Sequence, residues 1–144
     1  MQVESNERPK NKFEIENIVD DNCEIVFYDN IQEIEKDTES GKKEKAYIYD
    51  MYRLKTTFRE NLAEDLENDE EKYQRWLELA KNKEKEENAA IEIAKLQEEL
   101  NNTDYKIIKC SEYQLAGLDI PYNIAELHSK RQILRDRINE LQEL

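Results

Sequence analysis

The chain has 144 residues and a formal net charge of −13, with 40% charged and 38% hydrophobic residues. This length allows one ordinary domain, or a small module joined to helices, and excludes a second large domain. The acidic balance disfavours direct binding to nucleic acid or to anionic lipid, because such binding depends on clustered Lys and Arg.

The first twelve residues, 1–12, are polar and are expected to be flexible. They lack the apolar core of a signal peptide, and no apolar run approaches the roughly 20 residues needed to cross a bilayer. Cys23 and Cys110 lie far apart and outside any Cys-x-x-Cys motif, which favours a reducing compartment. These features predict a protein that is made and kept in a cytoplasm, or that leaves it when a cell lyses.

Residues 13–56 are predicted to form a small antiparallel β-sheet of three to four strands. Turn residues separate short runs rich in β-branched and aromatic side chains, at 13–19, 23–28, 31–35 and 46–54. The last two runs are expected to pair as a hairpin with its polar tip at 38–43, where Gly41 supplies a positive φ. A sheet of this size needs a cover, either from the helix that follows or from a neighbouring subunit.

Residues 57–102 are predicted to hold a short helix and then a long helix. Phe58, Leu62 and Leu66 recur every four residues, which indicates a short amphipathic helix. The stretch 69–101 has no Gly or Pro and is rich in strong helix formers. Its apolar stripe is interrupted by the polar stretch 81–88, so we expect its two ends to contact different structures: the sheet first, and the C-terminal helices second.

Residues 103–144 are predicted to form a C-terminal helical hairpin that resembles a coiled-coil bundle. The polar stretch 101–104 is expected to break the long helix before a short helix at 105–115. Gly117 is typical of the left-handed residue after a helix, and Pro121 of the first turn of the next one. The fold class is therefore α+β, with the small N-terminal sheet followed by a long helix and this hairpin.

The final helix, predicted at 122–142, carries apolar residues at alternating spacings of three and four, which is a heptad seam interrupted by Arg131. One interpretation is that this seam folds onto the end of the long helix in the same chain. The other is that it also joins identical or different subunits, and the two can coexist. The predicted partner-binding seam contains Ile93, Leu96, Leu100, Ile124, Leu127, Leu134, Ile138 and Leu141.

Aromatic residues concentrate in the last predicted strand, at the start of the long helix and near the C-terminal turn. Tyr and Trp combine a large apolar area with a polar tip, which suits protein interfaces as well as half-buried cores. The predicted aromatic partner-binding surface contains Tyr47, Tyr49, Tyr52, Tyr73 and Trp76.

No pattern in the chain predicts a catalytic, cofactor-binding or metal-binding residue. His128 is the single histidine, the acidic run 65–71 lacks the central glycine of a calcium loop, and the two glycines cannot build a phosphate-binding loop. Carboxylates are so abundant that no acid pair stands out for general acid and base chemistry. We therefore expect a protein that is not an enzyme and needs no cofactor, with an unfamiliar carboxylate site as the weaker alternative.

Two parts of the chain have a recognisable sequence. The first part is 27–30 through 49–54, followed by Arg59-Glu60-Asn61-Leu62. The second is Thr103 to Cys110, followed by Arg131-Gln132 to Arg135-Asp136 and by Ile138-Asn139. Both parts resemble small proteins encoded among the tail genes of phages and prophages of low-GC Gram-positive bacteria. The resemblance implies a structural or assembly role in the tail, baseplate or fibre, either as a minor component or as a fibre chaperone. Its partners would be tail, baseplate or fibre subunits, or further copies of this chain.

The net charge supports one alternative function. A chain this acidic could imitate DNA and block the basic groove of a host nucleic-acid-binding or defence protein. Such an inhibitor would group its carboxylates on one surface, whereas the many Glu and Lys residues three or four apart favour helices with interspersed charges.

Overall fold

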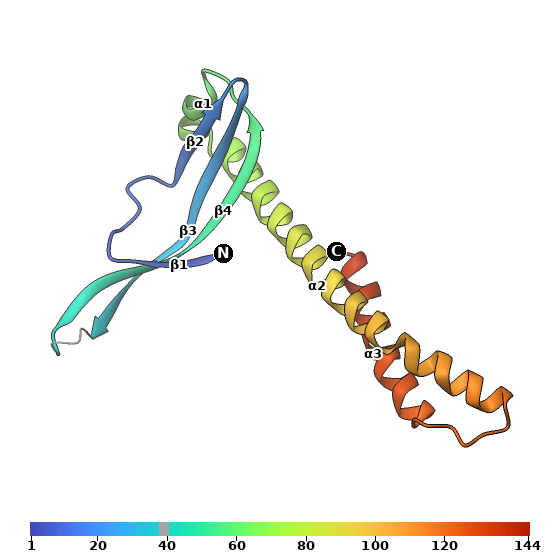
Figure 1. The fold of residues 1–144 in the computed structure, drawn as a ribbon. Helices are drawn as coiled ribbons and strands as arrows, with labels where there is room; N and C mark the ends of the chain where they lie inside the picture. Colours follow the sequence, from blue (N-terminus) through green and yellow to red (C-terminus); the bar gives the residue numbers. More distant parts are fainter. Residues whose placement is uncertain (38–40) are drawn as a thin grey trace. The chain divides into compact units, whose positions relative to one another are not determined.

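A four-stranded antiparallel sheet precedes three helices in the computed structural model, which describes residues 1–37 and 41–144 (Figure 1). This order confirms the predicted α+β class. The chain divides into two compact units, the sheet unit Met1–Glu84 and the hairpin unit Lys85–Leu144. Its elements are β1 Gln2–Ser5, β2 Phe13–Val19, β3 Asn22–Asp37, β4 Lys43–Thr57, α1 Leu62–Asn68, α2 Glu70–Leu115 and α3 Ile124–Gln142.

The strands of the sheet unit lie in the order β1-β4-β3-β2. β3 and β4 form the expected hairpin, with Ile34 opposite Ala46, and Gly41 before β4 has the expected positive φ of 74°. Residues 38–40 of the predicted tip lie outside the described residues. The predicted runs 23–28 and 31–35 are one strand, β3, with an irregularity in its pairing between them.

That irregularity is a β-bulge, and it lies where the sequence pattern indicated a turn. Asn30 has a φ of 51°, a value that Asn tolerates better than most residues. Its backbone N–H donates to the carboxylate of Asp29 at 3.0 Å, and its side-chain amide donates to Asp50 on β4 at 2.8 Å. These local bonds let β3 continue past the extra residue.

One face of the sheet forms a core with α1 and the beginning of α2. Ile25 and Phe27 of β3 point to this face and are fully buried, because alternate residues of a strand share a face. The cluster also contains Phe13, Cys23, Leu62, Leu66, Tyr73, Leu77 and Ala80. The cover that the small sheet requires is therefore supplied by helices of the same chain.

The N-terminus is more ordered than the flexible segment expected for 1–12. β1 pairs with β4 at the edge of the sheet, and the terminal amine donates to the carbonyl of Met51 at 3.0 Å. The same amine forms an ion pair with Glu84. The sequence pattern did not indicate this strand, because Val3 is its one apolar side chain. Backbone hydrogen bonds to β4 stabilise it instead.

Helix α2 continues through 101–104, where the sequence pattern predicted a break. Thr103 does not cap a new helix. Its hydroxyl donates to the carbonyl of Leu100 at 2.9 Å, as Ser and Thr often do inside a helix. The guanidinium of Arg131 on α3 donates to the same carbonyl and to Asp104, both at 2.6 Å. These tertiary bonds offset the low helix propensity of the stretch, and no helix end marks the predicted boundary at 102 and 103.

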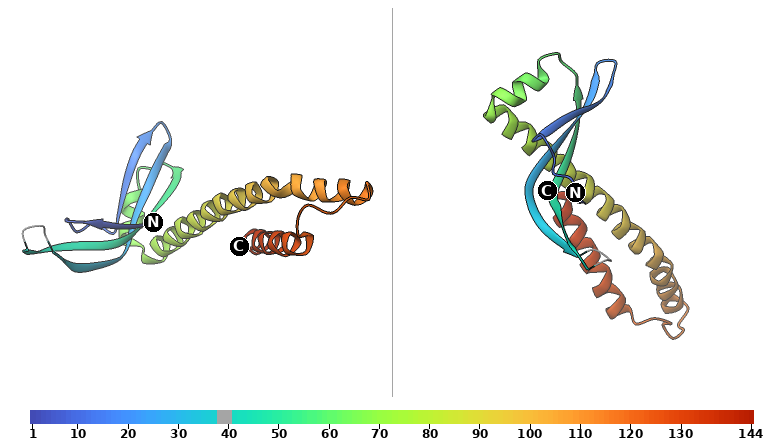
Figure 2. Two further views of the ribbon diagram at one scale, coloured as in Figure 1. Left: turned by 60° about the horizontal axis from the view of Figure 1, so that its bottom comes forward. Right: turned by 90° about the vertical axis from the view of Figure 1, so that its left-hand side faces the viewer.

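In the hairpin unit, α3 runs antiparallel to the second part of α2 (Figure 2). An ion pair of 2.8 Å joins Glu92 to Arg137. Nearer the connecting loop, the rings of Tyr105 and Tyr122 meet edge to face with centroids 6.5 Å apart. The C-terminal hairpin predicted from the heptad pattern is thus present, although its first helix is the end of α2 rather than a separate short helix.

The turn between these helices follows standard capping rules. Gly117 has a φ of 70°, and the N–H of Leu118 donates to the carbonyl of Tyr113 at 2.9 Å, which is the Schellman pattern. The side chain of Asn123 accepts a hydrogen bond from the N–H of Glu126 at 3.1 Å and caps α3. Pro121 lies before this cap, not in the first turn as predicted.

The boundary between the two units falls inside α2, between Glu84 and Lys85. This position lies within the polar stretch 81–88 that separates the two apolar stripes of the sequence. On one side of it, Leu77 and Ala80 belong to the sheet core, and on the other side Ala89 is buried in the hairpin unit. The interrupted stripe therefore corresponds to two separate packing environments, as expected.

Candidate functional site

The aromatic surface predicted from the sequence is divided by the sheet, and Tyr73 is not part of any surface. Its side chain is only 5% exposed and packs against Phe27 and Phe13, with ring centroids 5.7 and 6.3 Å away. Its hydroxyl donates to the carbonyl of Lys12 at 3.3 Å. Burial, followed by the nearby charges of Asp29 and Glu70, raises the pKa of Tyr73 to about 12. This residue stabilises the core.

The other four aromatic residues lie on opposite sides of the sheet. Tyr52 and Trp76 pack against the edge of the core and are half-buried. Tyr47 and Tyr49 alternate with Tyr52 along β4, so they point to the face that the helices do not cover. The structure therefore does not bring these residues together as one binding surface.

The uncovered face of the sheet contains a smaller aromatic pair. Tyr28 and Tyr49 meet edge to face with centroids 5.5 Å apart, and the Tyr28 hydroxyl donates to Glu14 at 3.0 Å. Burial is the main cause that raises the pKa of Tyr28 to about 12, and the bond to Glu14 adds to it. A shallow groove of about 290 Å³ lies beside this pair, bordered by the loop that contains residues 7–10.

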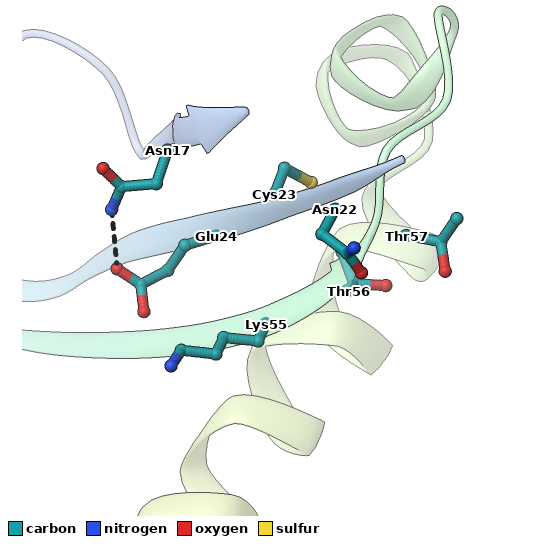
Figure 3. A pocket seen from close by; sticks show the side chains of 7 residues that line it. All are labelled: Asn17, Asn22, Cys23, Glu24, Lys55, Thr56 and Thr57. Atoms are coloured by element: carbon teal, nitrogen blue, oxygen red, sulfur yellow. Dashed lines mark hydrogen bonds between the residues drawn. The ribbon is translucent and has the colours of Figure 1, made fainter. Parts of the chain in front are cut away.

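A hollow of about 630 Å³ lies at the end of the sheet (Figure 3). The Asn17 amide donates to Glu24 at 3.4 Å, and Lys55 lies beside them. The Cys23 side chain turns to the opposite side of β3 and is 3% exposed, and burial raises the pKa of its thiol. A protonated, buried thiol is a poor nucleophile, so this hollow does not present an activated group.

The part of the chain that the structure describes contains neither a metal-binding cluster nor a membrane-spanning helix. In residues 1–37 and 41–144, no three His, Cys, Asp or Glu side chains converge as a metal-binding group. None of the helices in those residues combines the length and apolar character needed to cross a membrane. His128 is exposed on α3.

The predicted seam lies between α2 and α3 of the hairpin unit and is incompletely buried. Ile138 and Leu141 are 7% and 6% exposed, whereas Ile124 near the loop is 40% exposed. The remaining seam residues are half-buried, namely Ile93, Leu96, Leu100, Leu127 and Leu134. Cys110, which the sequence pattern did not place in the seam, is fully buried. The first interpretation of the seam, packing within one chain, accounts for these positions.

Arg131 occupies a seam position and is 8% exposed. Besides its bonds to Leu100 and Asp104, its guanidinium donates to the Thr103 hydroxyl, while its Nε lacks a partner among the described residues. A buried cation that is held mainly by oxygens of the neighbouring helix fixes how the two helices align. Sequence reasoning recognised Arg131 as a weak point of an apolar seam but missed these partners, because they lie about 30 residues away.

Exposed apolar side chains are concentrated in the hairpin unit. Of the thirteen large hydrophobic residues exposed in the described chain, nine lie in Lys85–Leu144. Leu115 is 90% exposed, Ile133 is 67% and Ile108 is 66%. The others are Ile91, Tyr105, Leu118, Ile120, Ile124 and Leu144. Exposed apolar residues that gather in one region are typical of a surface that binds protein.

Comparison with known proteins identifies no relative, since no family model, curated protein or solved structure matches the chain.

Proposed function

We propose that the protein acts by binding other proteins, as a tail-associated structural or assembly component of a phage or prophage, and that it is not an enzyme. The hairpin unit is the binding element. Its specific role is that of a minor baseplate or fibre component or a chaperone of a fibre protein, present in the bacterial cytoplasm during assembly and, as a component, in the tail particle.

One observation supports the binding role above the others: nine of the thirteen exposed large apolar side chains in the described residues lie in the hairpin unit, and four lie in the sheet unit. Two antiparallel helices bury a single seam, whereas stable helical bundles enclose a core from more sides. Leu118 and Ile120, in the loop between α2 and α3, are 57% and 43% exposed although the loop could have been polar. Such residues are stabilised by contact with another protein.

The assignment to a phage tail depends on the sequence resemblance. The resembling segments include 103–110, 131–136 and 138–139, which contribute to the hairpin unit. In this structure, these segments hold Arg131 and its partner Asp104. The second of the two resembling parts therefore lies in the element proposed to bind, while the first lies in the sheet unit. The kind of partner that the resemblance implies is a tail, baseplate or fibre subunit.

A capture experiment from an induced lysogen tests this proposal. The tagged full-length chain is expected to retain tail, baseplate or fibre proteins, identified by mass spectrometry. The variant Leu118→Glu is expected to lose most of this capture, because it puts a charge into an apolar contact.

Ile18→Glu is the matched control. Ile18 is 52% exposed, comparable with Leu118 at 57%, but it lies on β2 of the sheet unit. The Ile18→Glu variant should still capture tail, baseplate or fibre proteins. Recovery of no tail or fibre protein by the unmodified chain would contradict the proposed function, and equal losses in the two variants would contradict the assignment to the hairpin unit.

The second candidate function is an acidic, DNA-mimicking inhibitor, supported by the net charge of −13. Ion pairs interspersed over both units reduce this support, for example those of Lys81 with Asp29 and of Arg137 with Glu92, because an effective mimic leaves its carboxylates grouped and unpaired. An inhibitor would bind a basic nucleic-acid-binding protein with an affinity that falls steeply as salt rises. Salt-insensitive capture of tail proteins would exclude this candidate.

A further inference from the structure

The two faces of the helical hairpin differ in charge. The seam positions repeat at spacings of three and four on both helices: Ala89, Ile93, Leu96, Leu100, Thr103, Ile107 and Cys110 on α2, and Ile124, Leu127, Arg131, Leu134, Ile138 and Leu141 on α3. All of them except Ile124 are buried or half-buried. Each residue that precedes or follows a seam position therefore lies about 100° to one side of it.

The residues that directly follow the seam positions are almost uncharged, although 40% of the chain is charged. Of these thirteen, Asp104 and Arg135 carry charge, and Asp104 is paired with Arg131. The thirteen residues that directly precede the seam positions contain nine charged side chains, including Glu92 and Arg137. Residues that follow the seam on antiparallel helices lie on the same side of the pair, so they form one continuous low-charge face.

The low-charge face has small, amide and apolar side chains in place of charges. Ala90 and Ala94 on α2 and Ala125 on α3 are exposed and would permit another helix to approach closely. Gln97 and Asn101 follow along α2, and Gln132 and Asn139 lie on α3. Ile108, which is 66% exposed, completes this face toward the loop.

We infer that the low-charge face binds the same face of a second copy of this chain, so that two hairpins form a four-helix bundle. This inference rests on the proposed function, because it assigns one partner to the binding element. A twofold contact places identical surfaces against each other, which would oppose like charges on most of a chain with a net charge of −13. The low-charge face avoids that repulsion.

Its side chains and its size also suit a second copy. An amide carries both donors and an acceptor, so Gln97 or Asn101 can hydrogen-bond to the same residue of a partner. The face extends from Ala90 to Ser111, roughly 33 Å at 1.5 Å per residue, and two adjacent helices are about 20 Å wide. The resulting footprint of about 650 Å² per copy approaches the ~800 Å² per partner that stable interfaces bury.

Sedimentation of the full-length chain tests this contact. The unmodified protein is expected to have twice the chain mass of 17.3 kDa. The double variant Gln97→Glu with Asn101→Glu should weaken self-association roughly tenfold or more, because it buries like charges at the contact. Asn88→Glu with Asn102→Glu is the matched control: it adds the same charges at exposed positions that precede the seam, and it should associate as the unmodified chain does.

A charge-reversed pair keeps the test decisive if a variant associates poorly because it is misfolded. The variant Gln97→Lys with Asn101→Lys should also self-associate more weakly when it is alone. Its mixture with the Glu variant should restore the double mass, since opposite charges then meet. A single-chain mass for the unmodified protein at all concentrations would overturn the inference. Equal weakening by the variant and its control would overturn it as well.

The same variants separate this inference from the proposed function. If the unmodified chain is monomeric and still captures tail proteins in a manner that depends on Leu118, the second copy is excluded while the proposed function stands. If the chain forms dimers through the low-charge face but captures no tail protein, the second copy stands and the tail assignment falls.

Discussion

The sheet unit and the hairpin unit bury their apolar side chains to different extents. In the sheet unit, Ile25 and Phe27 are completely buried in the core between the strands and the helices. In the hairpin unit, the seam between two helices is half-buried, and Leu115 and Ile133 are 90% and 67% exposed. A helical layer against a sheet can enclose a core within one chain, whereas two helices enclose little more than a line of contact. The comparison indicates that the sheet unit encloses a core of its own, whereas the hairpin unit leaves many of its apolar side chains exposed.

The largest expected effect comes from opening the core of the sheet unit. Phe27→Ala should lower the free energy of unfolding of this unit by about 4 kcal/mol, because it removes a large, fully buried ring. Val19→Ala, at a position 65% exposed, should change it by less than about 0.5 kcal/mol. Urea titration followed by the fluorescence of Trp76, the single tryptophan, reports on this unit. Similar effects for both variants would show that the sheet core is not closed.

Alkaline pH should destabilise the sheet unit through Tyr73. Its pKa is about 12 in the folded chain against an ordinary value of 10.0, so the folded state keeps the proton longer than the unfolded state. The resulting stability is fully present below pH 10 and is lost as the pH rises toward 12, amounting to about 3 kcal/mol. Unfolding measured against pH should show a smaller loss in Tyr73→Phe. Tyr105→Phe, at a 56% exposed position of the hairpin unit, should leave the profile unchanged.

The hairpin unit should depend on Arg131 more than on its apolar seam residues near the loop. Arg131→Ala removes the bonds to Leu100 and Asp104 and should destabilise the packing of α3 by about 2 kcal/mol. Hydrogen exchange of α3 amides should then accelerate roughly thirtyfold. Lys130→Ala, whose side chain is 71% exposed, is the control and should change exchange little. An equal response to both would mean that the buried guanidinium does not align the helices.

The smallest effect is expected where the hairpin turns. Gly117 has a φ of 70°, and a Cβ there would meet nothing within 4 Å, so the cost of Gly117→Ala is the left-handed backbone alone. We expect a loss of about 1 kcal/mol, measured as faster exchange at the end of α2. Gly117→Asn should recover part of it, because Asn tolerates this conformation. An unchanged exchange rate in Gly117→Ala would show that the Schellman turn contributes little.

Elements defined by local pattern were predictable from the sequence. The hairpin around Gly41, the short helix with Leu62 and Leu66, and the heptad seam of α3 each depend on residues close together in the chain. The short helix begins at Leu62, so Phe58, which was expected in it, lies between β4 and α1. β1 was missed because it contains one apolar residue and is held by backbone bonds to β4. The bulge at Asn30 was interpreted as a turn, since Asp-Asn is compatible with both until the pairing of the strands is known.

The candidate site was predictable only in part, because its decisive contacts are distant in sequence. The stretch 101–104 resembles a helix break, and it remains helical since Arg131 binds it from α3. The heptad spacing located the seam but could not say how deeply it is buried. The predicted aromatic surface was wrong at Tyr73. This residue lies on α2, which covers the sheet, so its side chain fills the core between the helix and the sheet.

Each unit also contains one concealed cysteine: Cys23, 3% exposed, in the sheet unit and Cys110, completely buried, in the hairpin unit. A thiol reagent can reach such a sulfur only when its surroundings open. The rate at which each thiol reacts therefore reports how often its own unit opens, and no label has to be introduced. The rate at which Cys110 reacts would slow as the protein is concentrated if association closes the hairpin unit, while the rate at Cys23 would stay constant.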